Sequence, residues 1–182
     1  MAGAQRRLED VAVTMAHDGE DVRELRLDAR VADGSALLIR LDLAGQGQTL
    51  NVSTNNAGAA LDALNWTNRI RGGQLTVRAQ RATMDAPMAG TVLVENFSLS
   101  NAPAIAKLLE FMSLTGILSA LSETGLAFDE MTANFNFNDG FLEFEEARAY
   151  GNSIGITGTG HIDTDAEFVA VEGTVVPAYS VN

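Results

Sequence analysis

Most of the chain alternates apolar and polar residues with a period of two, the pattern of β-strands that have one dry face and one wet face. In Glu24–Val31 the odd-numbered positions are Leu, Leu, Ala and Val, and the even-numbered positions are charged. Leu37–Gly45 repeats the pattern, with Ile39, Leu41 and Leu43 on the apolar side. These segments predict half-buried strands.

The segment Thr132–Ala147 predicts a β-hairpin. Phe135 and Phe137 fall on one face of its first strand, and Leu142 and Phe144 return on the same face of the second. Between them, Asp139-Gly140 is a strong two-residue turn signal. Two more apolar-alternating segments follow, at 153–163 and 167–176. The fold class expected is therefore mainly β: a long, curved antiparallel sheet that forms a groove.

Two segments, 55–70 and 101–125, break the alternation and predict helices. Both are rich in alanine and leucine and open on Asn, a favoured N-cap residue. Pro103 falls in the first turn of the second, where its missing N–H is tolerated. The window 104–121 within it, interrupted by Gly116, is apolar on nearly all sides. Such a helix is expected to be buried, and the curled sheet could hold it.

The two helical segments belong to a possible internal repeat. Residues 51–64 align with 96–109 at an offset of 45, with Asn, Ser, Ala and Leu positions in common. Residues 71–80 then resemble 138–147, which gives copies at 51–80 and 96–147, the second with a longer insert. Repeats of this kind bury by stacking a surface that no single unit can bury. We expect residues 1–182 to form a single domain.

Composition narrows the class of partner. The chain has 182 residues, 46% hydrophobic and 20% charged, with a formal net charge of −12. This acidity argues against nucleic acid as a partner. Cysteine is absent, which leaves no disulfide framework. No segment has the roughly 18 consecutive apolar residues that a spanning helix needs, and the N-terminus has no signal-peptide pattern.

The sequence contains few patterns that are typical of catalytic or metal-binding sites. His17 and His161 are the only histidines, and neither has a partner that the sequence identifies. Glu143, Glu145 and Glu146 are most simply the wet face of a strand. The carboxylates of Asp163, Asp165 and Glu167 have the first spacing of a calcium loop but lack its later glycine and glutamate. We therefore expect no cofactor, no metal site and no enzyme.

Several motifs of the second half occur in an order that resembles a known family. They are the Asn-Ala-Pro helix start at 101–103, Leu-Thr-Gly at 114–116, Phe128-Asp129, the Asp-Gly hairpin and Pro-Ala-Tyr at 177–179. Together they resemble the C-terminal region of AsmA-like proteins, in particular the YhdP-like branch of Gram-negative bacteria, related to TamB and other bridge-like lipid transfer proteins. The resemblance runs roughly from Leu25 to the end. In that family the chain continues beyond this point, so the sequence looks like a piece of a longer protein.

The resemblance implies a function without catalytic residues. AsmA-like proteins are anchored in the inner membrane and extend across the periplasm, and their β-grooves are thought to shield phospholipid or fatty acyl chains moving toward the outer membrane. The partners implied here are such lipids and the remaining repeats of the full-length protein, in the periplasm. The candidate groove residues are Phe135, Phe137, Leu142, Phe144, Ile154, Ile156, Val169 and Val171.

Alternatives remain open at this point. The dry faces of strands are most often an ordinary core, covered by helices or a second sheet. A structural or interaction module would have a packed core and pair its sheet edges with neighbouring repeats or another chain, without lipid cargo. A hydrolase would need a nucleophile beside His161 or a Glu pair, and the sequence shows none. An interfacial membrane helix at 104–121 is disfavoured because basic flanks are lacking.

Overall fold

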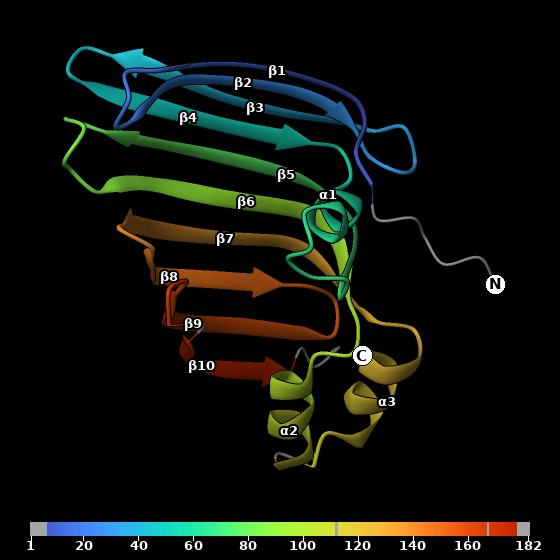
Figure 1. The fold of residues 1–182 in the computed structure, drawn as a ribbon. Helices are drawn as coiled ribbons and strands as arrows, with labels where there is room; N and C mark the ends of the chain where they lie inside the picture. Colours follow the sequence, from blue (N-terminus) through green and yellow to red (C-terminus); the bar gives the residue numbers. More distant parts are fainter. Residues whose placement is uncertain (1–6, 112, 167, 178–182) are drawn as a thin grey trace.

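The chain folds into one antiparallel sheet whose ten strands are neighbours in the order of the sequence (Figure 1). This computed structural model describes residues 7–111, 113–166 and 168–177. The strands are β1 (Glu9–His17), β2 (Val22–Arg30), β3 (Ala36–Ala44), β4 (Gly47–Thr54), β5 (Ile70–Arg81), β6 (Met88–Leu99), β7 (Leu126–Asn138), β8 (Phe141–Tyr150), β9 (Ile154–Asp163) and β10 (Phe168–Pro177). The mainly β, curved antiparallel fold expected from the alternation is confirmed.

The β7–β8 hairpin forms as the sequence predicts. Asp139 and Gly140 have φ values of 45° and 78°, the left-handed conformation that a two-residue hairpin turn requires at both positions. Phe137 pairs with Leu142, and Phe135 with Phe144. A β-bulge follows, since Asn134 pairs with Glu146 and the ladder skips one residue of β8. The four predicted dry-face side chains therefore share one face.

The first predicted helix is shorter than expected. Residues 55–70 were predicted as helical, but α1 covers only Ala57–Ala63. The side chain of Asn56 caps its start, because its Oδ1 accepts the backbone N–H of Ala59 at 3.0 Å. Asn65, with φ of 60°, turns the chain out of the helix. The rest of the segment is a loop that leads into β5.

The second predicted helix is two helices. α2 (Pro103–Phe111) has Pro103 in its first turn as predicted, although Asn101, the predicted N-cap, lies before it with φ of 52°, and α3 (Thr115–Glu123) follows a sharp break. The break lies at Ser113, whose φ is 57°, and not at Gly116, which lies in the first turn of α3. Met112 lies outside the described residues. The exposed residues of both helices include Lys107, Glu110, Ser119 and Glu123, so each helix has a wet side as well as a buried one.

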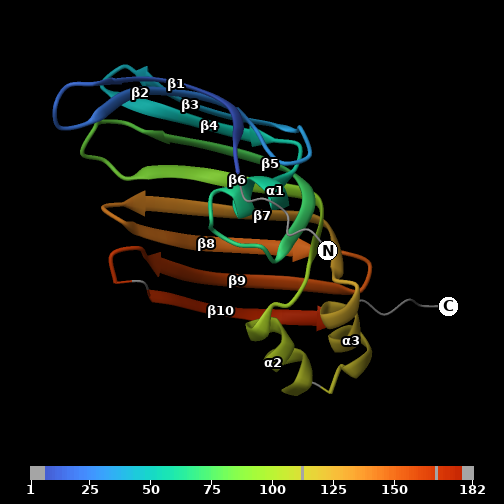
Figure 2. The ribbon, with the colours of Figure 1, turned by 45° about the vertical axis from the view of Figure 1, so that its right-hand side comes forward.

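The helices cover one end of the sheet. Figures 1 and 2 place α1 in front of the sheet at one end of the strands, and α2 and α3 beyond the lower strands at the same end. The larger core cluster joins Leu109 of α2 and Leu121 of α3 to strand residues that include Phe128 and Ile154. A smaller one joins Ala60 of α1 to Val31 and Leu37. We call this the covered end; the hairpin turns of β1–β2, β3–β4, β5–β6, β7–β8 and β9–β10 lie at the other, the turn end.

The alternation changes phase near the covered end. Val94 and Phe97 of β6 are three residues apart, yet both are buried in the larger cluster. Between them, Asn96 has φ of 54°, and on β5 the facing Gly73 has φ of 86°. A Cβ on Gly73 would lie 2.8 Å from the Cβ of Phe97, so glycine is required there. The irregularity turns Phe97 inward, where its ring stacks on that of Phe128 at 5.1 Å.

The internal repeat and the single domain stay predictions. The structure does place a helix after β4 and helices after β6, in agreement with the aligned segments 51–64 and 96–109. The downstream resemblance, however, pairs β5, which follows α1 directly, with β8, which follows α3 only after β7. The longer insert of the second copy would therefore include a whole strand.

Candidate functional site

One face of the sheet, the face on which the helices pack, carries a continuous apolar surface. Cross-strand pairing aligns its side chains in rows that run across the strands. The first row contains Met15, Leu25, Leu41, Leu50, Ala79, Gly90, Phe135, Phe144, Gly160 and Val171. The second row contains Val13, Leu27, Ile39, Val52, Val77, Val92, Ala133, Ala147, Gly158 and Gly173. We call these two rows the apolar strip and the face the inner face.

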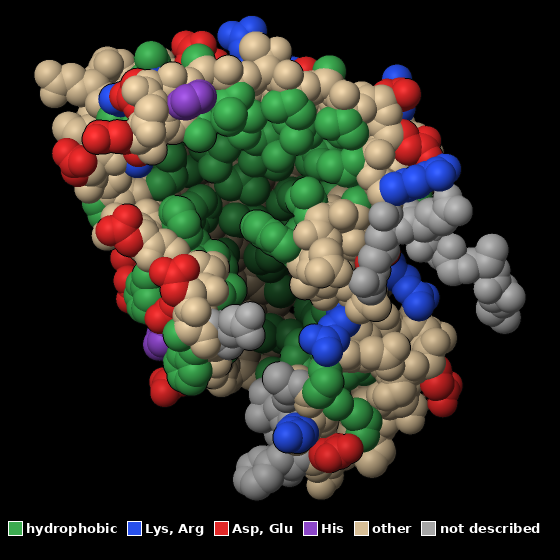
Figure 3. Space-filling model, in the orientation of Figure 1, with side chains coloured by type: hydrophobic (Ala, Val, Ile, Leu, Met, Phe, Trp, Pro, Cys, Tyr) green, Lys and Arg blue, Asp and Glu red, His purple; other side chains and the backbone are tan. Residues whose placement is uncertain are grey.

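The apolar strip has one position in every strand of each row, and none of its residues has a polar side chain. With a strand spacing of about 4.8 Å, ten strands give the strip a length of roughly 43 Å along the sheet. Figure 3 shows the apolar side chains gathered in a hollow of the inner face.

The two rows differ in how far the helices cover them. No residue of the first row belongs to either core cluster or packs against one, whereas four residues of the second row do: Leu27, Ile39, Val52 and Val92. The second row therefore marks the border of the covered end, and the first row lies outside both clusters, although its Ala79 and Phe135 are buried. Several of its side chains, Leu25, Leu41 and Leu50 among them, are half-buried by their neighbours on the sheet.

Six of the eight predicted groove residues lie in the apolar strip or beside it. Phe135, Phe144 and Val171 belong to the first row. The other three, Phe137, Leu142 and Val169, form the adjacent row on the turn side, which Met88 and Ile162 complete. Phe137 is 41% exposed and Val171 is 70% exposed, whereas Phe135 is only 8% exposed.

The other two predicted groove residues belong to the covered end. Ile154 is fully buried in the larger core cluster, which agrees with the alternative of an ordinary packed core at this position. Ile156 is half-buried and packs against the same cluster. Both lie on the inner face, as the alternation indicates, but their end of β9 lies in the packed cluster that α2 and α3 complete. The helices, which are distant in sequence, decide which part of this face is accessible.

The strands of the N-terminal half contribute as much to the apolar strip as those of the C-terminal half. The prediction named no groove residue before Phe135, yet Leu50 and Val77 occupy equivalent positions on β4 and β5. The signal was present, since 49–53 and 75–79 alternate in the same way. What the sequence did not show was that all ten strands belong to one sheet in register.

A polar cluster lies on the inner face at the turn end. Gln48 of β4 is 1% exposed, and its Nε2 donates to the carbonyl oxygens of Val22 and Arg23 at 2.7 and 2.8 Å. Its Oε1 accepts from Nε and Nη2 of Arg81 at 2.9 and 2.6 Å. Gln48 thus reaches from β4 past β3 to the backbone of β2, which ties the curled N-terminal strands together.

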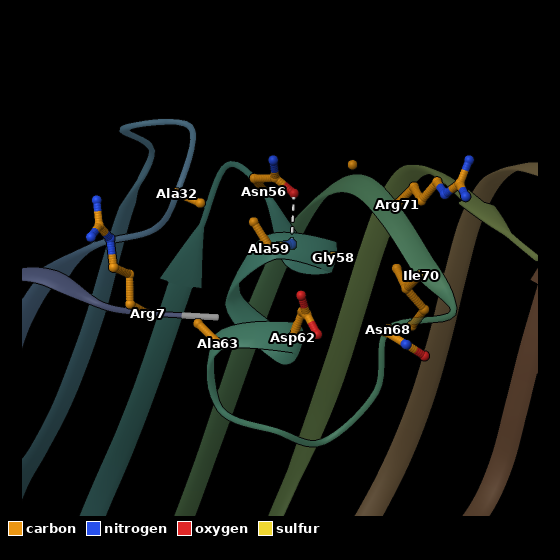
Figure 4. A pocket seen from close by; sticks show the side chains of 11 residues that line it. Arg7, Ala32, Asn56, Gly58, Ala59, Asp62, Ala63, Asn68, Ile70 and Arg71 are labelled. Atoms are coloured by element: carbon orange, nitrogen blue, oxygen red, sulfur yellow. Dashed lines mark hydrogen bonds between the residues drawn. The ribbon is translucent and has the colours of Figure 1, made fainter. Parts of the chain in front are cut away.

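A cavity lies beside α1 at the covered end and has a volume of about 290 Å³. Its lining is mostly apolar, but it also includes the polar side chains of Arg7, Asn56, Asp62, Asn68 and Arg71 (Figure 4). Arg7 also pairs with Glu9, at 2.7 Å between Nη2 and Oε1. Charged side chains of both signs therefore line this cavity, whereas the apolar strip has none.

The predicted acidic and histidine residues lie on the outer face or in turns. Glu143, Glu145 and Glu146 lie on the outer face, where Oε1 of Glu145 accepts from Asn136 at 3.1 Å. His161 lies near the rings of Phe141 and Phe168, with centroid distances of 5.1 and 5.8 Å. His17 accepts the backbone N–H of Gly19 at 3.1 Å.

The segment that has part of the carboxylate spacing of a calcium loop is a turn held by its own hydrogen bonds. Oδ1 of Asp163 accepts the backbone N–H groups of Asp165 and Ala166 at 3.0 and 2.9 Å. Glu167 lies outside the described residues. Among the residues that the structure describes, no group of three or more His, Cys, Asp or Glu side chains could hold a metal ion.

Shifted pKa values occur at the surface and not in the apolar strip. Backbone N–H donation from Asp21, with Arg23 beside it, lowers the pKa of Asp18 to about 2. The amide of Asn56 donates to Asp33 at 2.6 Å and lowers the pKa of that carboxyl. The negative charges of Glu130 and its neighbours raise the pKa of Tyr150. Asp18 and Asp33 thus take part in hydrogen bonds of turns and of the start of α1.

Within the described part of the chain, no helix has the length and apolar character needed to cross a membrane. Searches among protein-family models, curated proteins and solved structures found no match. The AsmA-like resemblance therefore remains a prediction that rests on the motifs of the sequence.

Proposed function

We propose that this chain shields the acyl chains of phospholipid or fatty acid on its inner face, as part of a periplasmic protein that carries lipid between the inner and outer membranes. The observation that supports the proposal best is the apolar strip itself, which crosses ten strands without a polar side chain and whose first row lies outside both core clusters. The proposed role is binding and transfer, without a chemical step.

The physical advantage of such a strip is large. Exposing hydrocarbon to water costs about 0.8 kcal/mol per methylene, or on the order of 10 kcal/mol for a sixteen-carbon chain. A strip roughly 43 Å long, at about 4.8 Å per strand, exceeds the length of one extended acyl chain. Contact with the strip on one side removes part of that cost along the whole chain. The strip has no side-chain donor or acceptor, so it favours hydrocarbon over a peptide or a sugar.

The most direct test is chemical identification of co-purified lipid. We expect the protein, extracted from cells under mild conditions, to carry phospholipid or fatty acid detectable by mass spectrometry. A lipid-free spectrum from such a preparation would contradict the proposal.

Two phenylalanines provide a matched pair for the same assay. Phe137 on the inner face is 41% exposed, and Phe141 on the outer face is 42% exposed. We expect Phe137→Asp to lose at least about tenfold of the bound lipid, because a carboxylate in contact with hydrocarbon is costly. Phe141→Asp should retain it. Both should keep the β-sheet circular dichroism spectrum; equal lipid loss in the two variants would place the lipid elsewhere.

A second candidate function follows from the edges of the sheet. Every residue of β1 is exposed, and β10 is the opposite edge strand. Open edges of this kind pair with further strands unless they are blocked. We propose that the remaining repeats of the full-length protein are the partners of these edges. Val176→Lys on β10, where the side chain is 60% exposed, should weaken such pairing without changing lipid content.

A further inference from the structure

The sole tryptophan of the chain has the most exposed large apolar side chain among the described residues. Trp66 is 78% exposed, and Leu64, two residues earlier, is 38% exposed. Both belong to the loop 64–69 that joins α1 to β5. Trp is seldom left in water, since its indole combines a large apolar surface with one N–H donor and prefers a boundary between apolar and polar surroundings.

The backbone that carries Trp66 is held in place. Its N–H donates to the carbonyl of Leu61 at 2.9 Å, and the N–H of Asn65 donates to that of Asp62 at 3.0 Å. The hydroxyl of Thr67 accepts the N–H of Arg69 at 3.2 Å. A fixed loop that exposes a large aromatic side chain is typical of a binding contact, because little conformational entropy remains to be lost on binding.

The loop leads from α1 into β5, between the cavity residues Asp62 and Asn68. Figure 4 shows it passing below α1, across the strands behind, before it returns to Asn68 and Ile70. β5 begins beside the cavity, whose lining includes Asn68 and Arg71 as well as Asp62, and further along the same strand it carries Val77 and Ala79 of the apolar strip. A molecule that has a hydrocarbon tail and a polar, anionic head could place its tail on the apolar strip and its head near Arg71, with its ester groups at the level of the loop.

We propose that Trp66 contacts the carbonyl end of the acyl chain of a phospholipid bound on the apolar strip, with the phosphate-bearing head toward Arg71 and Asn68. This inference rests on the proposed function and adds to it an orientation for the cargo. The indole ring covers the first methylenes of the chain, and its N–H donates to an ester carbonyl. Leu64 extends the same contact.

Because Trp66 is the only tryptophan, its fluorescence reports on this contact in the unmodified protein. The probes are phosphatidylglycerol molecules brominated near the carbonyl end or near the methyl end of the chain, with binding confirmed by native mass spectrometry. We expect a blue shift on binding and stronger quenching by bromine near the carbonyl end. Equal quenching by both probes, or stronger quenching by bromine near the methyl end, would overturn the orientation.

A reporter on the opposite face is the control. Phe141→Trp in a Trp66→Phe background places the fluorophore on the outer face, where the same bound lipid should not quench it. Trp66→Ala should weaken lipid binding by about tenfold and leave thermal unfolding unchanged, because the side chain is exposed. Bound brominated lipid without quenching of Trp66 would overturn this inference and leave the proposed function standing. No binding of lipid at all would overturn both.

Discussion

The covered end and the rest of the inner face are built from the same sequence pattern but differ in what lies above them. At the covered end of β7, Phe128 is 2% exposed and stacks on Phe97 within the cluster that α2 and α3 complete. Toward the turn end of the same strand, Phe137 also lies on the inner face, but it is 41% exposed and belongs to neither core cluster. One strand thus presents the same residue type as packed core at one end and as accessible apolar surface at the other.

Within one sheet, the covered end therefore contributes to the stability of the fold, and the rest of the inner face is available for binding. Residues under the helices gain their free energy from close packing, whereas those of the strip leave apolar area in contact with water. A contiguous apolar surface that no helix covers often marks a binding surface. The helices therefore do two things: they complete the core at one end, and by ending there they leave the rest of the inner face accessible.

The largest expected effect comes from truncating the two phenylalanines of β7. Phe128→Ala should lower the free energy of unfolding by about 3–5 kcal/mol, because it removes a buried ring and its stacking contact. Phe137→Ala should lower it by about 1 kcal/mol or less, since the ring is largely exposed. Urea unfolding followed by circular dichroism measures both. Similar losses would mean that the two regions do not differ in packing.

The next effect tests how the uncovered end is held together. Arg81→Met should lower the free energy of unfolding by about 1–3 kcal/mol, because the buried Oε1 of Gln48 loses both of its donors. Arg78→Met, on the exposed outer face of the same strand, is the control and should change stability by less than about 0.5 kcal/mol. Equal losses in the free energy of unfolding would mean that the polar cluster does not hold β4 and β2 together.

A smaller effect tests the cover supplied by α1. Asn56→Ala should cost about 1 kcal/mol, because the N-cap bond to Ala59 is lost. The pKa of Asp33 should rise toward its ordinary value at the same time, since the amide donor that lowers it is gone. Chemical denaturation and carboxyl NMR titration measure these two changes. Asn55→Ala, one residue outside the cap, should change neither.

The smallest effect concerns the β1–β2 turn. The pKa of Asp18 is lowered from 3.8 to about 2 in the folded protein, so its ionised form stabilises the turn above about pH 4. That contribution is lost as the pH falls from about 4 toward 2, because the carboxyl then takes up its proton. Asp18→Asn should flatten the pH dependence of stability in this window. An unchanged profile over the same window would show that this turn adds nothing to the folded state.

The strands that alternate regularly could be predicted from sequence, and so could the Asp139-Gly140 turn and the start of α2 at Pro103. Local pattern decides these features. The break at Ser113 and the short α1 could not be predicted, because a serine or asparagine in the left-handed conformation has no unique sequence mark. The change of phase at Asn96 could not be predicted for the same reason, although the sequence does show the Gly72-Gly73 pair on the facing strand.

The sequence could predict which face of the sheet carries the candidate site, but not how much of that face is accessible. Alternation placed Phe137 and Ile154 on the same side of the sheet correctly, since side-chain direction follows from the strand itself. It could not tell that one is exposed and the other buried, because that depends on where α2 and α3 pack. Nor could it give the path of the loop that carries Trp66, since the path of a loop over a sheet is set by tertiary contacts.

The central claim is that the apolar strip holds hydrocarbon, and photocrosslinking tests it most directly. A fatty acid with a diazirine in its chain would be bound, irradiated and located by peptide mass spectrometry. The account predicts adducts on strip residues such as Leu50, Val77 and Phe144. Adducts concentrated on the outer face, at Phe141 or Phe168, or spread evenly over both faces, would contradict it.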